Sequence, residues 1–72
     1  MHYSQIITRM DIESNIQTRL DMLQNRVNLV SISPSIRQKV MSEVIDYINL
    51  LQEYEIKVPE KLYNWIDYLN GV

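Results

Sequence analysis

Hydrophobic residues recur along the chain at the three- and four-residue intervals that are typical of amphipathic helices. Between residues 11 and 30 the apolar positions form one stripe: Ile12, Ile16, Leu20, Leu23, Val27 and Val30. An α-helix turns about 100° per residue, so these side chains share one face. Arg9 would lie in the middle of that stripe if the helix extended further back. We therefore expect a first helix over residues 11–30, capped by Thr8 or Asp11.

A second amphipathic pattern covers residues 34–56 and carries more apolar side chains than one neighbour can cover. Its central stripe consists of Ile36, Val40, Val44, Tyr47, Leu51 and Tyr54, and it is widened by Met41, Ile45 and Ile48. The apolar arc exceeds half the circumference, so this helix needs packing partners on two sides. We expect it to be central, packed by the first helix and by a third helix or a second chain.

Two prolines and one glycine mark helix boundaries. Ser33-Pro34 is typical of an N-cap followed by the first helical residue, and Pro59 indicates the start of a third helix over residues 59–70. Asn70-Gly71 predicts a left-handed C-cap for that helix. Short connections favour antiparallel neighbours.

The predicted fold class is therefore all-α. We expect an antiparallel helical hairpin plus a shorter third helix, that is, a three-helix bundle completed by dimerisation. Residues 1–10 are predicted to form an N-terminal arm, and residues 11–72 a single helical domain.

Several apolar residues lie off the predicted core stripes. On the first helix Met22 and Leu29 repeat at seven residues on a flank. On the third helix Trp65 and Tyr68 lie beside the expected buried stripe, and the sequence leaves open whether Trp65 completes the chain's own core or anchors a partner. Protein interfaces concentrate Trp, Tyr, Met and Arg. The predicted partner-binding residues are Met22, Leu29, Met41, Ile45, Ile48, Trp65 and Tyr68.

Size and charge favour association with another protein chain. Seventy-two residues are near the lower limit for a single core, and the chain has no cysteine to supply disulfides or thiolate ligands. Residues 1–40 carry a net charge of +2 and residues 41–72 a net charge of −4. This gradient suits self-association or a modestly basic partner, and it argues against a nucleic-acid backbone as the partner.

The sequence offers few groups for catalysis, and we predict no enzymatic activity, no cofactor and no metal. The only histidine is His2, and the single glycine excludes a glycine-rich phosphate loop. We also expect no membrane segment and a cytoplasmic location, because no apolar run approaches the roughly 20 residues that span a bilayer. The lack of alanine suggests an AT-rich bacterial or phage genome.

The sequence also allows two alternatives to protein binding. The stretch from Ser42 to Asp46 resembles the serine-to-aspartate helix motif of small aspartyl-phosphate phosphatases, although Glu43-Val44 stands where that motif has Gln-Glu. This resemblance implies a phosphatase-like regulator centred on Ser42 and Asp46.

The other alternative is weak nucleic-acid binding through a basic strip of Arg19, Arg26, Arg37 and Lys39. A helix-turn-helix is a related possibility, with Lys57-Val58 as a two-residue turn. The turn lacks the usual glycine, and the third helix carries Glu60 and Asp67 beside Lys61. The function that the sequence favours is instead a non-enzymatic protein-interaction module, such as an adaptor, inhibitor or assembly factor, acting as a homodimer.

Overall fold

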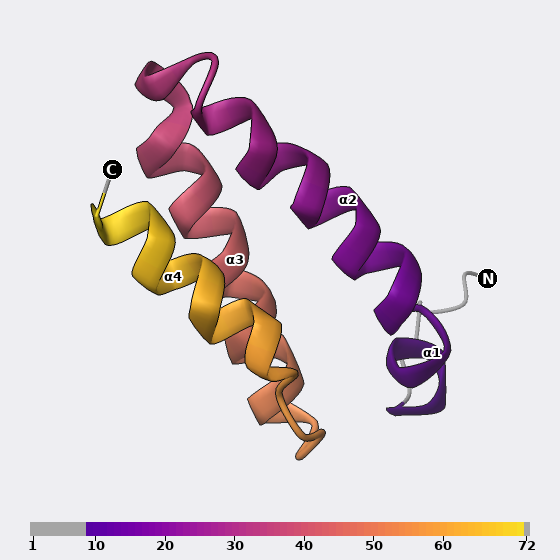
Figure 1. The fold of residues 1–72 in the computed structure, drawn as a ribbon. Helices are drawn as coiled ribbons and strands as arrows, with labels where there is room; N and C mark the ends of the chain where they lie inside the picture. The colour runs from indigo at the N-terminus through magenta and orange to yellow at the C-terminus, as the bar shows by residue number, and fades with distance from the viewer. Residues whose placement is uncertain (1–8, 72) are drawn as a thin grey trace, which may run out of the picture.

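The computed structural model describes residues 9–71, and this part of the chain is all-α without strands. Its elements are α1 (Arg9–Ser14), α2 (Ile16–Val30), a 3₁₀ turn η1 (Pro34–Ile36), α3 (Arg37–Glu53) and α4 (Glu60–Gly71). Helices α2 and α3 form an antiparallel hairpin, and α4 lies alongside α3 (Figure 1). The predicted hairpin with a shorter third helix is confirmed.

The helix predicted over residues 11–30 is interrupted at Asn15, so the prediction of one continuous helix is wrong. The backbone of Asn15 has φ −103° and ψ 2°. Ser14 Oγ and Asn15 Nδ2 each donate a hydrogen bond to the carbonyl oxygen of Asp11 at 2.9 Å. Such side-chain bonds compete with the helical ladder.

The interruption also changes the angular register of the chain that precedes it. Arg9 and Met10, which were assigned to the arm, belong to α1, and Arg9 forms an exposed ion pair with Glu13 at 3.4 Å instead of entering the core. The expected cap Thr8 and the rest of the arm, including His2, lie outside the described residues.

The second helix also differs from its predicted ends. Pro34 opens the 3₁₀ turn, and α3 begins only at Arg37, while the side chain of Ser33 forms no capping hydrogen bond. The helix ends at Glu53 rather than at residue 56. Beyond it the amide of Ile56 donates a hydrogen bond to the carbonyl oxygen of Leu51 at 2.9 Å. The amide of Glu55 donates one to the carbonyl oxygen of Gln52 at 3.0 Å. This pair of bonds is a Schellman motif, which places Glu55 in the left-handed region at φ 57°.

The predicted left-handed cap at the end of α4 is wrong. Gly71 is the last helical residue and does not have a positive φ. Instead, Nη1 of Arg37 reaches across from α3 and donates a hydrogen bond to the carbonyl of Leu69 at 3.3 Å. A cation near a helix C-terminus satisfies an otherwise unpaired carbonyl and complements the helix dipole.

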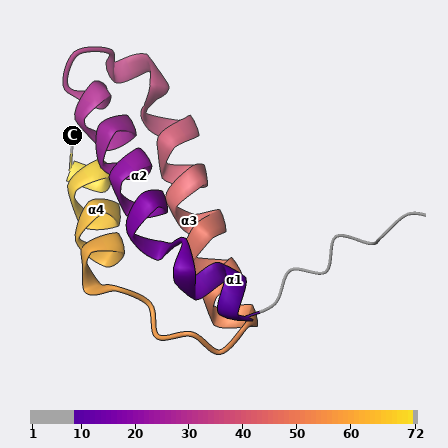
Figure 2. The same ribbon diagram turned by 90° about the vertical axis from the view of Figure 1, so that its right-hand side faces the viewer.

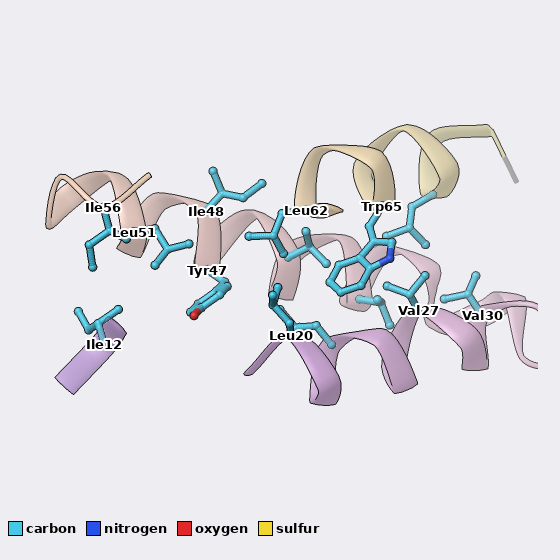
Figure 3. Close-up of a cluster of buried hydrophobic side chains, with 14 residues drawn as sticks. Ile12, Leu20, Val27, Val30, Tyr47, Ile48, Leu51, Ile56, Leu62 and Trp65 are labelled. Carbon is cyan, nitrogen blue, oxygen red and sulfur yellow. The ribbon is translucent and has the colours of Figure 1, made fainter. Parts of the chain in front are cut away.

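Side chains from all four α-helices meet in one core (Figure 3). Helix α2 lies in front of both α3 and α4 in Figure 2, and Trp65 points from α4 toward α2 near Val27 in Figure 3. At the other end Ile12 of α1 faces Ile56. No charged side chain among residues 9–71 is buried. The sequence left the role of Trp65 open. Trp65 is only 7% exposed and packs in this cluster, so it completes the chain's own core.

Candidate functional site

The surface between α2 and α3 contains two adjoining hollows of about 400 Å³ and about 330 Å³, which share Arg19 and Met22. We call them together the α2–α3 groove. The larger hollow lies beside the break at Asn15 and has apolar walls from Ile12 and Leu50. The smaller hollow extends toward Arg26 and is completed by Leu23, Glu43 and Asp46. Helix α2 diverges from α3 toward α1 in Figure 1, and both hollows are lined by residues of these two helices.

A bidentate ion pair closes one end of the groove. Arg26 of α2 donates to both carboxylate oxygens of Glu43 on α3, from Nε at 2.9 Å and from Nη2 at 2.8 Å. Hydrogen bonding to Arg26 lowers the pKa of Glu43, and the same contact raises the pKa of Arg26. Parallel bonds of this kind fix the relative position of the two helices as well as their charges.

Arg19 and Tyr47 form a second contact between α2 and α3. The guanidinium carbon of Arg19 lies 5.4 Å from the centre of the Tyr47 ring, within the range of a cation–π interaction. Tyr47 is only 4% exposed, and its hydroxyl has no hydrogen-bond partner among the described residues. Burial raises the pKa of Tyr47, while the positive charge of Arg19 opposes the rise. The phenol is therefore neutral at physiological pH.

The two edges of the groove carry opposite charges. Arg19 and Arg26 belong to the α2 edge, and Glu43 and Asp46 belong to the α3 edge. Arg26 and Glu43 pair with each other, whereas Arg19 and Asp46 form no ion pair within the described part of the chain. Arg19 and Asp46 are thus the charged residues of the smaller hollow that lie outside this ion pair.

Met22 and Leu29 lie on the same flank of α2 as Arg19 and Arg26, as their helical spacing requires. Met22 is 55% exposed and Leu29 is 43% exposed. The opposite flank of α2 is polar, with hydrogen bonds from Gln17 to Asp21 and from Gln24 to Asn28. The predicted apolar flank of α2 is therefore accessible and faces the groove side of the bundle.

The remaining predicted partner-binding residues do not join this surface. Ile48 and Trp65 are buried in the core, because α4 covers the second side of α3 within the same chain. Met41 is partly buried against the core, Ile45 is 41% exposed, and Tyr68 is exposed on α4. The seven residues thus divide between the groove side, the α3–α4 side and the core.

Sequence reasoning missed Leu50 and the contact of Arg19 with Tyr47, both of which shape the larger hollow. It also missed the exposed apolar side chains of Met10, Ile32 and Tyr63. The signal for the hollow was Ser14-Asn15, because both residue types form side-chain bonds to the backbone and favour helix ends.

The residues of the phosphatase-like alternative, Ser42 and Asp46, lie one helical turn apart on α3. Ser42 and Asp46 are both exposed, and only Asp46 reaches the groove. Among residues 9–71 no group of three or more His, Cys, Asp or Glu side chains is arranged to hold a metal ion.

Three cations of the predicted basic strip, Arg19, Arg26 and Lys39, lie near the carboxylate of Glu43, and each of them lowers its pKa. Arg26 pairs with Glu43, Arg37 caps α4, and Arg19 stacks on Tyr47. Residues 54–59 connect α3 and α4, so the predicted two-residue turn is wrong. The two helices lie side by side and antiparallel, unlike the crossed helices of a helix-turn-helix (Figures 1 and 2).

No protein-family model, curated protein or solved structure matches this chain. No helix in the described region has the length and apolar character needed to cross a bilayer.

Proposed function

We propose that the chain is a non-enzymatic protein-interaction module that binds through apolar helix faces, with the α2–α3 groove as its main contact surface. The main observation behind the proposal is that Met22 and Leu29 are exposed on the groove side of α2. Neither side chain belongs to the hydrophobic core or packs against it. Their exposure is thus not required by the fold.

The chemistry of the groove supports this proposal. Methionine adapts its shape to different apolar surfaces, and arginine is among the side chains that interfaces concentrate. Met22 and Arg19 line both hollows, so an apolar group and a cation are presented together. Such a concave surface, apolar with a few polar groups, is suited to side chains of another protein.

Site-specific photo-crosslinking in the native host tests the proposal. A photoreactive amino acid in place of Met22 is expected to form a discrete protein adduct. The same probe in place of Gln17, which is exposed on the opposite, polar flank of α2, is expected to form none. Substituting Leu29→Lys in the Met22 probe variant is expected to remove the adduct while changing the free energy of unfolding by less than about 0.5 kcal/mol. Equal labelling at both positions, or none at Met22, would contradict the proposal.

A further inference from the structure

We infer that the partner of the α2–α3 groove is a second copy of this chain, bound about a two-fold axis that runs along the groove. The inference rests on the proposed function and specifies the partner. Its basis is the distribution of charge across the smaller hollow, to which α2 contributes Arg19 and Arg26 and α3 contributes Glu43 and Asp46.

The unpaired charges select among the possible partners. Arg26 and Glu43 neutralise each other, whereas Arg19 and Asp46 line the same hollow without an ion pair among the described residues. An acidic helix in the groove would pair with Arg19 but be repelled by Asp46, and a basic helix would meet the reverse problem. A second copy presents both signs and satisfies both residues.

A two-fold axis along the groove gives the required placement. Such an axis sets α2 of each copy over α3 of the other, because a two-fold interface is self-complementary. Arg19 of each copy then faces Asp46 of the other, and the ion pair forms twice. The net charges of +2 on residues 1–40 and −4 on residues 41–72 act in the same direction, because α2 comes from the first segment and most of α3 from the second.

The apolar residues of α2 supply the contact between these ion pairs. Met22 and Leu29 are two helical turns apart, which separates them by about 10 Å along the α2 axis. In the inferred dimer both side chains are covered by the other copy, and Met22 enters the groove that it also lines.

Charge reversal in the purified 72-residue chain tests this arrangement. We expect sedimentation equilibrium to show a dimer, and we expect Asp46→Arg and Arg19→Asp each to raise the dissociation constant at least about tenfold, because each creates two like-charge contacts. An equimolar mixture of the two variants is expected to restore association as a heterodimer. Asp67→Arg and Lys61→Asp, on exposed positions of α4 outside the groove, are the matched controls and are expected to leave the dissociation constant unchanged.

Several outcomes would overturn the inference. The first is a wild-type chain that stays monomeric at several hundred micromolar. The second is an Asp46→Arg variant that associates as strongly as Asp67→Arg. The third is a failure of folded Asp46→Arg and Arg19→Asp to associate with each other when they are mixed. Circular dichroism checks the folding of each variant. If Arg19→Asp does not fold, the comparison of Asp46→Arg with Asp67→Arg still decides the question. A monomeric purified chain whose Met22 probe crosslinks to a different protein would refute the second copy but retain the proposed function.

Discussion

At the scale of single residues, the buried hydroxyl of Tyr47 has no hydrogen-bond partner among the described residues. The ring is buried between α3 and α2, where Arg19 lies against it, and none of the described residues hydrogen-bonds the oxygen. A buried polar group without a partner costs roughly 1–3 kcal/mol of stability. The fold therefore tolerates a destabilising group beside the groove.

Replacing Tyr47→Phe is expected to raise the free energy of unfolding by about 1 kcal/mol, because the phenyl ring keeps the packing and removes the unsatisfied hydroxyl. Chemical denaturation of the purified protein at a fixed chain concentration measures the change. The control is Tyr63→Phe, since the Tyr63 side chain is exposed and its oxygen accepts only a 3.5 Å hydrogen bond from Gln52. A loss of stability in Tyr47→Phe would show that the hydroxyl is hydrogen-bonded after all.

At the scale of the helices, the end of α3 is set by the Schellman motif around Glu55. The motif directs Ile56 back into the core beside Leu51 (Figure 3) and starts the connection to α4. Its left-handed position is normally glycine, because a Cβ atom there makes unfavourable contacts with the backbone. The chain has glutamate at this position, with φ 57°.

Substituting Glu55→Gly is expected to stabilise the fold by about 1 kcal/mol and to raise the melting temperature by roughly 5 °C. Thermal unfolding followed by circular dichroism measures this shift. Glu55→Ala removes the same charge but keeps the Cβ strain, so it is expected to remain close to wild type. Equal shifts in both variants would assign the gain to the charge instead of the backbone.

The sequence predicted which helices form better than it predicted where they end. Regular apolar stripes identified α2, α3 and α4, because burial of one face dominates helix formation. The ends depend on local bonds that periodicity does not encode. The break at Asn15 follows from two side-chain bonds to one carbonyl, and the left-handed Glu55 is a residue type that rarely takes that conformation.

At the scale of the whole molecule, the candidate site was predicted in part. The exposed flank of α2 followed from spacing alone, and Met22 and Leu29 are accessible as the pattern indicated. Ile48 is among the predicted residues because the apolar arc of the second helix is wide, and Trp65 because it lies beside the expected buried stripe of the third helix. Only the tertiary structure shows that α4 of the same chain covers this arc. In that arrangement Trp65 points from α4 toward α2 and is buried between them (Figure 3).

The ion pair between Arg26 and Glu43 makes the stability of the hairpin depend on pH. The folded pKa of Glu43 lies below its unfolded value, so the pair stabilises the fold above about pH 4.5. This contribution is lost as the pH falls through the lower, folded pKa.

Glu43→Gln is therefore expected to melt below wild type at pH 6 and to approach it near pH 3. Thermal melts across this range measure the convergence. Glu53→Gln, which changes an exposed carboxylate on the same helix, is expected to show no such convergence. A Glu43→Gln deficit that is constant with pH would show that the lost stability is not ionic.

The interruption at Asn15 also divides the molecule energetically. Ile12 is the one side chain of α1 that is buried, and its burial supplies about 1.5–3 kcal/mol. Global unfolding of a domain typically requires about 5–15 kcal/mol. Partial unfolding of α1 is thus a low-energy fluctuation that leaves the other helices intact and briefly hydrates the end of the core around Ile56.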